Sequence, residues 1–270
     1  MKRPFWSAMI VSLLFASLLM VFASASTAQL KNIEGLVAYY TFDGGSANDM
    51  STNGHDGKLV GGATFVNDDG APVPNGKGSV EFKRQPGNAV DGGPGEKLEK
   101  NLTLMAWAKV TEAGVTQYVA GTPYDDGAAW DAPWVGYQIG VRGGKMATWL
   151  NIAAVDAEYD SGVVKAGEWT HLAFTFSGNE AISYVNGEEV ANKPDRKGKI
   201  EFEGEPHFMI GERSHTAKGE PFGELIDEVA LFNRVLTPAE IKQAMKGGLA
   251  LTVQYKGKLT TTWGNIKTRY

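Results

Sequence analysis

Apolar, aromatic and β-branched residues recur along the chain in short segments that are separated by turn residues. Alternation of period two, typical of strands, runs through most of these segments. They cover residues 35–42, 78–82, 102–110, 115–121, 135–151, 168–190, 205–212 and 224–232. Asn186-Gly187 is the strongest hairpin signal in the chain, because both residues tolerate positive φ. The pattern predicts an all-β, two-sheet antiparallel β-sandwich.

The last of these segments carries acids in an apolar setting. Leu225, Val229 and their neighbours make both faces of the segment largely apolar, apart from Asp227 and Glu228. This predicts a strand that is buried on both sides.

A helix-start signal follows this strand. Thr237 is in position to cap a helix, Pro238 stands at the first helical position, and Glu240 lies three residues after the cap. One short helix is therefore predicted from Pro238 to about Met245, ended by Gly247-Gly248.

The N-terminus has the pattern of a secretory signal. Lys2 and Arg3 precede an apolar run over residues 5–22, and small residues follow it. This predicts a signal peptide over residues 1–25, with an uncleaved signal anchor as the alternative. Residues 26–34 are then a lead-in, 35–248 one domain, and 249–270 a tail that adds an edge strand or docks a partner.

The composition limits compartment and partners. The 270 residues include no cysteine, and removal of the signal peptide would take the net charge from −5 to about −7. An acidic surface argues against nucleic acid and anionic membranes as partners. The absence of cysteine and of His-pair spacing argues against zinc. We therefore expect a secreted, periplasmic or cell-surface protein, with an oligomeric state that the sequence leaves open.

Four segments occur in an order that resembles a known family. They are "GLVAYYTFDGG", "LTLMAWAKV", "AGEWTHLAFTFSGNEAISYVNGEEV" and "GELIDEVALFNRVLTPAEI". Together they resemble a laminin-G-like jelly-roll domain of the concanavalin A-like lectin/glucanase superfamily over residues 35–248. The resemblance implies two curved antiparallel sheets, an exposed concave face, loops at the rim, and a short helix after the last strand.

The resemblance also implies a structural calcium ion. In this family calcium often joins the end of the first strand to the final strand, which carries the role over to Asp43 and Asp227. Carboxylates with backbone carbonyls suit this cation, and Gly44-Gly45 would let the backbone turn its carbonyls towards it. The alternative is that Asp227 only accepts hydrogen bonds from backbone amides near the sheet edge.

Catalysis was tested against the laminarinase-type relatives of the family. Those enzymes place acids at alternate positions of one strand, so that they share a face. In "ELIDE", Glu224, Ile226 and Glu228 share one face by alternation while Asp227 points to the other, and Ile226 replaces the middle acid. No catalytic residue is therefore predicted, and the chain is expected not to be an enzyme of this type.

The segment 121–134 is the most individual stretch of the chain. It combines Tyr124 and Trp130 with Asp125 and Asp131, and Trp149 could contribute from the concave face. Aromatic rings offer flat faces to sugar C–H groups, and carboxylates accept hydrogen bonds from hydroxyls, so these residues are the predicted ligand site. The alternative is that the aromatic residues anchor a long loop.

These features favour a secreted, non-catalytic binding module that recognises carbohydrate or an extracellular protein. A glycoside hydrolase or lyase with acids outside the tested pattern is one alternative. A structural or assembly protein, with its contact in the tail, is the other.

Overall fold

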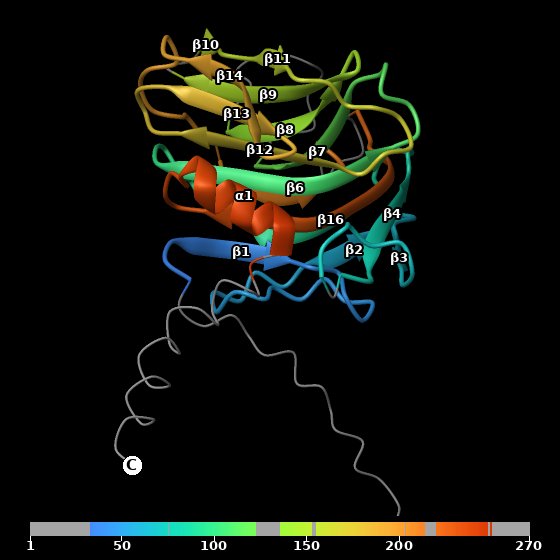
Figure 1. Cartoon of the computed structure of the whole chain (residues 1–270). Helices are drawn as coiled ribbons and strands as arrows, with labels where there is room; N and C mark the ends of the chain where they lie inside the picture. The colour runs from blue at the N-terminus through green and yellow to red at the C-terminus, as the bar shows by residue number, and fades with distance from the viewer. Residues whose placement is uncertain are drawn as a thin grey trace, which may run out of the picture.

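The protein is a sandwich of two antiparallel sheets, as the sequence predicts. A computed structural model describes residues 33–74, 76–122, 136–152, 155–202, 204–213, 220–247 and 249. Each sheet has eight strands, and one short helix lies on the outer face of the first sheet, in front of β6 in Figure 1. The predicted signal peptide and nearly all of the tail lie outside the described residues.

The first sheet contains the two longest strands. Its strands are β1 Leu36–Tyr40, β3 Thr64–Val66, β4 Ser79–Lys83, β6 Leu102–Val110, β12 Thr170–Phe176, β13 Ala181–Val185, β14 Glu188–Lys193 and β16 Gly223–Phe232. Their order is β14-β13-β12-β6-β16-β4-β3, and β1 also pairs with β16. β6 and β16 thus form the centre of this sheet.

The second sheet is built mainly from the middle of the chain. Its strands are β2 Lys58–Val60, β5 Ala89–Pro94, β7 Gln117–Gly121, β8 Tyr137–Arg142, β9 Lys145–Ile152, β10 Val155–Asp156, β11 Tyr159–Ser161 and β15 His207–Ile210. Their order is β10-β9-β8-β7-β15-β5-β2, and β11 also pairs with β9. β8 and β9 form a hairpin through Gly143-Gly144, as predicted.

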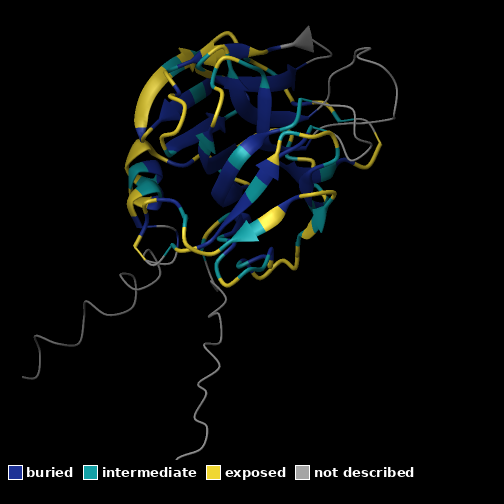
Figure 2. Ribbon diagram, turned by 90° about the vertical axis from the view of Figure 1, so that its right-hand side faces the viewer, coloured by how far each residue is buried: buried dark blue, intermediate teal, exposed yellow. Residues whose placement is uncertain are grey.

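The core lies between the two sheets. On β6, Leu102, Leu104 and Ala106 alternate inward and join the main cluster, which also takes Val141 and Leu150 from the second sheet. Figure 2 shows this layering, with buried residues on the strands and exposed residues concentrated at the loops. Burial of these side chains is the main source of stability in the sandwich.

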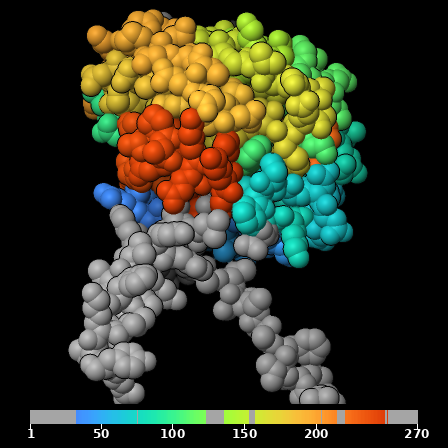
Figure 3. Space-filling view, viewed as in Figure 1, coloured from blue at the N-terminus to red at the C-terminus, as the bar shows by residue number. Residues whose placement is uncertain are grey.

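The helix α1, Pro238–Gly247, covers the outer face of the first sheet. Its buried residues Ile241 and Ala244 belong to a second cluster with Met105, Ala173 and Tyr184 from β6, β12 and β13. Figure 3 shows the helix seated against this face. Both faces of the central strands are therefore buried, which explains their nearly continuous apolar sequence.

The predicted helix start is confirmed in detail. The Thr237 hydroxyl accepts the Glu240 amide at 3.3 Å, and the Glu240 carboxylate accepts the Thr237 amide at 2.8 Å. This reciprocal capping box satisfies donors that the first helical turn leaves free. Arg234 also contacts Glu240, and these contacts lower the pKa of Glu240 to about 2.

The strand β16 contains a bulge at its two buried acids. β4 pairs with residues 223–226 of β16 and β1 with residues 229–232, so the two strands follow one another along the same edge. The pairing with β6 shifts register between Asp227 and Ala230, and Glu228 has φ of 52°. Ile226 and Val229 both point into the main core. The prediction that Glu228 shares a face with Ile226 is wrong, because the bulge breaks the alternation.

A buried histidine on the same outer face gives the protein a calculable pH response. His171 on β12 packs its ring against Trp107 of β6, and burial lowers the pKa of His171 to about 3. Below pH 6.5 the unfolded chain protonates this residue, whereas the folded chain does not until about pH 3. Between pH 7 and pH 5 we expect His171 to lower the free energy of unfolding by about 2 kcal/mol.

Urea unfolding of the parent and of His171→Gln at both pH values measures this effect. The difference between the two proteins isolates His171, because other titrating groups are common to both. Equal pH dependence in the two proteins would contradict the expectation.

Candidate functional site

The predicted ligand residues fall into two groups. Tyr124, Asp125, Trp130 and Asp131 lie outside the described residues, so the structure does not test them. Trp149 is described: it lies on β9, on the outer face of the second sheet. The strands β7, β8 and β9 around Trp149 form the candidate site.

Trp149 lies flat on the sheet, packed against a second aromatic ring. Its ring centre is 4.5 Å from that of Tyr118 on β7, with 34° between the ring planes. Gly140 on the intervening strand makes room, because a Cβ atom there would be 2.9 Å from the Trp149 ring. That Cβ atom would also lie 2.2 Å from the Gln117 carbonyl oxygen, so the mid-strand glycine is required by the backbone of β7 as well as by the indole. Tyr118 and Trp149, the aromatic pair, form the centre of the site.

Two arginines stand over the aromatic pair. The guanidinium carbon of Arg142 is 5.5 Å from the centre of the Trp149 ring, and that of Arg213 is 5.7 Å from the Tyr118 ring, distances typical of cation–π contacts. Arg142 is held in place by Asp160 and Glu158, each at 2.9 Å. Two carboxylates therefore surround the single guanidinium charge of Arg142.

One acid beside the aromatic pair has a shifted pKa. Partial burial raises the pKa of Glu220, and the Glu158 charge adds to the rise. Arg213 and Arg142 act in the opposite direction, as does a hydrogen bond from Tyr118. Glu220 therefore borders the site as an acceptor whose charge interacts with those of both arginines.

Two amide side chains next to the aromatic pair have unsatisfied oxygens. Gln138 pairs directly with Trp149 across β8 and β9, and Asn151 lies two residues further along β9, on the same face as Trp149. The two side chains are 7% and 3% exposed. Within the described part of the chain, neither Gln138 Oε1 nor Asn151 Oδ1 has a hydrogen-bond partner. Both oxygens are shielded from solvent, and such unpartnered buried atoms are rare in folded proteins.

The predicted calcium ligands lie at the end of β1 and at the bulge of β16. Asp227 is fully buried and accepts the Ala71 amide at 2.8 Å and the Glu228 amide at 2.7 Å. Asp43 accepts the amides of Lys77 and Gly78 through one oxygen, at 2.8 and 2.9 Å. Both acids therefore anchor the loop between β3 and β4, which includes Ala71.

The buried acids of the bulge repel one another. Burial raises the pKa of Asp227 to about 9, and the charge of Glu228 contributes. Burial also raises the pKa of Glu228 to about 7, against the lowering influence of a hydrogen bond from the Tyr39 hydroxyl. Asp43 is close enough to raise both pKa values. Asp43, Asp227 and Glu228 make up the acidic cluster, and the raised pKa values favour the neutral form of its two buried acids.

With the fold and site described, comparison with known proteins is informative. A family model described as the concanavalin A-like lectin/glucanases superfamily matches residues 84–242. The chain belongs to this superfamily. No curated protein matches the chain.

Solved structures with the same fold include single domains of other proteins. One is domain 4 of AbnA, a GH43 extracellular arabinanase from Geobacillus stearothermophilus, in complex with arabinotriose, with 18% identity and a TM-score of 0.57. That match covers 78% of this chain and 98% of that one.

Toxin binding domains share the fold as well. The binding domain of Paraclostridial Mosquitocidal Protein 1 has 12% identity and a TM-score of 0.58, with 78% of this chain and 52% of that chain covered. The botulinum neurotoxin serotype G binding domain has 12% identity and a TM-score of 0.56, with 78% and 50% covered. The chain thus spans about half the length of these toxin domains. At this identity the likeness extends to the fold alone.

The acidic cluster contains the two residues, Asp43 and Asp227, at which a calcium ion is expected from the sequence. Among the described residues, no group of three or more His, Asp or Glu side chains could hold a metal ion. A calcium ion at Asp43 and Asp227 would therefore need main-chain carbonyl oxygens or water for its remaining ligands. A cation would relieve the repulsion within the cluster, and the carboxylates of Asp43 and Asp227 already accept backbone amides.

Most of the site residues that the sequence prediction missed lie on β7, β8 and β9, and Arg213 and Glu220 lie between β15 and β16. The missed residues on the three strands are Tyr118, Gln138, Arg142 and Asn151. Alternation within β8 and β9 places Gln138, Arg142 and Asn151 on the face of Trp149, and a glycine at position 140 was a signal for a flat-lying ring. Only the tertiary structure shows that this face carries two amide side chains with unsatisfied oxygens. It also shows that, among the described residues, no helix covers this face.

Proposed function

We propose that this protein is a non-catalytic carbohydrate-binding module. The ligand would lie on the outer face of the second sheet, over β7, β8 and β9. The observation that carries the proposal is the pair of unsatisfied amide oxygens of Gln138 and Asn151 beside the aromatic pair. Sugar hydroxyls are donors that these oxygens need, and sugar C–H faces suit aromatic rings.

The nature of the surrounding charges supports a neutral glycan. Each arginine at the site faces a carboxylate: Arg142 contacts Asp160 and Glu158, and Arg213 influences Glu220. A highly charged ligand would attract one member of each arginine–carboxylate pair and leave the other member without an oppositely charged partner. The AbnA domain, of the same fold, was solved with arabinotriose, a neutral oligosaccharide. An extracellular protein partner is the alternative occupant of the same face.

Two further parts of the proposal rest on the sequence. We expect the module to be exported, because of the signal-like pattern over residues 1–25. No helix in the described residues is long and apolar enough to cross a membrane. We also propose a structural calcium ion at Asp43 and Asp227, supported by the repulsion within the acidic cluster. This ion would stabilise the junction of β1, β4 and β16 rather than contact the glycan.

A glycan-array screen of residues 26–270, in calcium and again in chelator, tests the proposed function. Binding to one class of neutral glycan would support it. An array without binding under both conditions would contradict it and favour a protein partner. Assay of the bound glycans for cleavage separates a binding module from a hydrolase.

Asn151→Leu provides a sharper test. Leucine has a similar size and lacks the unsatisfied oxygen, so the variant should be about 1 kcal/mol more stable than the parent. It should also bind the glycan about tenfold more weakly, because the ligand loses a buried acceptor. Urea unfolding and calorimetric titration measure the two effects.

Asn192→Leu is the matched control, since Asn192 lies on the edge strand β14 of the other sheet. It should leave glycan affinity unchanged. A loss of stability in Asn151→Leu together with unchanged affinity would show that Asn151 serves the fold rather than the ligand.

A further inference from the structure

A groove opens at the edge of the sandwich, away from the aromatic pair. It has a volume of about 450 Å³ and is lined by Asn53, Gly54, His55, Pro94, Gly95, Glu96, Lys97 and Glu205. These residues come from the connection between β1 and β2, from the end of β5 and its following loop, and from the segment before β15. The volume lies in the range of small-molecule sites.

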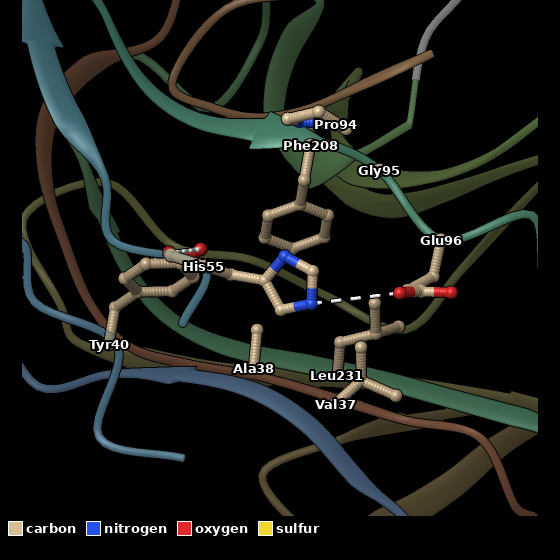
Figure 4. A pocket seen from close by; sticks show the side chains of 9 residues that line it. All are labelled: Val37, Ala38, Tyr40, His55, Pro94, Gly95, Glu96, Phe208 and Leu231. Carbon is tan, nitrogen blue, oxygen red and sulfur yellow. Dashed lines mark hydrogen bonds and ion pairs between the residues drawn. The ribbon is translucent and has the colours of Figure 1, made fainter. Parts of the chain in front are cut away.

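A small apolar pocket continues inward from this groove. The two share His55, Pro94, Gly95 and Glu96, and the inner pocket is closed by Val37, Ala38, Tyr40, Phe208 and Leu231 (Figure 4). Its volume is about 10 Å³, which is the space for one methyl group or one water molecule.

The inner pocket suits a methyl group better than water. A buried water needs two to four polar partners. The one hydroxyl of the lining, on Tyr40, already donates to the His55 carbonyl oxygen at 2.7 Å. Apart from His55 and Glu96, the lining side chains are aliphatic or aromatic, and the Tyr40 and Phe208 rings are parallel within 11° and 6.1 Å apart. A ligand that fits must therefore present a small apolar substituent.

The mouth of the groove is polar and carries both donors and acceptors. His55 Nε2 lies 3.7 Å from Glu96 Oε1, and Lys97 Nζ lies 3.1 Å from Glu205 Oε1. In Figure 4 the His55 imidazole points across the mouth towards Glu96. Exposed pairs of this kind contribute little to stability, so a ligand can replace one member without a large penalty. Donors and acceptors then face the same space, as a hydroxyl-rich neutral ligand requires.

We propose that this groove is a second ligand site that binds a sugar unit carrying a methyl group, with the methyl group in the inner pocket. Acetamido sugars and 6-deoxy sugars share this chemistry. This inference rests on the proposed function in one respect: the assumption that the ligand is a carbohydrate. The location of the groove, its inner pocket and its polar mouth are independent of the aromatic pair.

NMR titration of the full mature chain tests the proposal, with chitotriose, L-fucose and glucose as probes. We expect the amide signals of Gly54 and Gly95 to shift with at least one of the first two probes. The affinity for that probe should exceed the affinity for glucose about fourfold, since burial of one methyl group is worth about this factor. Response to only one of the two distinguishes an acetamido from a 6-deoxy sugar.

Glu96→Gln should weaken this binding about tenfold, because it removes a charged acceptor at the mouth. Within the described part of the chain the Glu96 carboxylate forms one ion pair, with His55, so the fold should be retained. Glu112→Gln is the matched control: Glu112 also forms one exposed ion pair, with Arg84, and does not line the groove. Val37→Ile, which adds one methylene at the inner pocket, should abolish the preference for methyl-bearing sugars.

The outcomes separate this inference from the proposed function. Shifts confined to β7, β8 and β9 would support the proposed function and overturn the second site. Shifts at Gly54 and Gly95 that disappear in Glu96→Gln but persist in Asn151→Leu would support the second site. Equal affinity for glucose and for the methyl-bearing probes would overturn the role of the inner pocket.

Discussion

Asp227→Ala is expected to lower the free energy of unfolding by about 4 kcal/mol. The carboxylate accepts the buried amides of Ala71 and Glu228, and alanine would leave both donors without a partner. Each buried donor that loses its partner costs about 1–3 kcal/mol. The loss should appear as a lower midpoint in urea, at unchanged slope, because the fold and its buried area remain the same.

Asp227→Asn separates the role of the hydrogen bonds from the role of the charge. Asparagine keeps one acceptor oxygen, so in the presence of chelator the free energy of unfolding should fall by about 2 kcal/mol relative to the parent. If calcium binds here, the parent should gain stability on calcium addition, about 2.7 kcal/mol at a hundredfold excess over Kd. Neither variant should show this gain.

The combined results distinguish the two interpretations of Asp227. A parent that melts identically in calcium and in chelator would refute the calcium proposal while leaving the amide-anchoring role intact. An Asp227→Ala variant as stable as the parent would refute the anchoring role as well. Because Asp43 anchors the same loop through Lys77 and Gly78, Asp43→Asn in the same assay shows whether the two acids act together.

Gly211→Ala is expected to destabilise the protein by about 3–4 kcal/mol. Gly211 has φ of 84°, a region that L side chains rarely adopt, and a Cβ atom there would lie 2.2 Å from the buried Phe82 ring. The backbone cannot shift freely, because Gly211 donates to Val119 and accepts from Phe222. The expected loss combines strain of about 1–2 kcal/mol with overpacking of about 1–3 kcal/mol.

Gly143→Ala is the control for the backbone contribution. Gly143 has φ of 58°, but nothing lies within 4 Å of the position of its Cβ atom. This variant should therefore lose only about 1 kcal/mol. If the two variants were equally destabilised in urea unfolding, the close approach to Phe82 would have no energetic consequence.

The two variants also differ in their expected effect on function. Gly211 precedes Glu212 and Arg213, and Arg213 stands over the Tyr118 ring of the candidate site. A displaced backbone at position 211 should therefore weaken glycan binding in Gly211→Ala. Gly143 lies in the turn between β8 and β9, so the Gly143→Ala variant should bind the glycan with nearly the affinity of the parent.

Local patterns in the sequence predicted most of the fold. β6 coincides with its predicted range, 102–110, because its strong β propensity is reinforced by burial on both faces. The helix and its capping box were predicted from Thr237, Pro238 and Glu240, whose interactions are local. The strands β2, β3, β10 and β11 were missed because two or three residues are too few to show an alternation, and β5 was missed because it contains Gly92, Gly93 and Pro94.

The candidate site was predicted only in part. Trp149 was identified from its residue type, and the structure places it on the outer face of the second sheet. Its partner Tyr118 lies about thirty residues earlier, and the contact exists because β7 and β9 flank β8. Strand order depends on long-range pairing, which no local pattern in a single sequence specifies.

The sequence by itself determined the all-β class, the helix with its cap, and the superfamily, because these depend on interactions between residues close along the chain or on motifs in a fixed order. The tertiary structure alone decided the bulge that turns Glu228 away from Ile226, and the meeting of Gln138 and Asn151 beside the aromatic pair. It also decided the groove at His55 and Glu96. These features arise where segments far apart in the sequence pack together, and their energies depend on burial that only the folded chain creates.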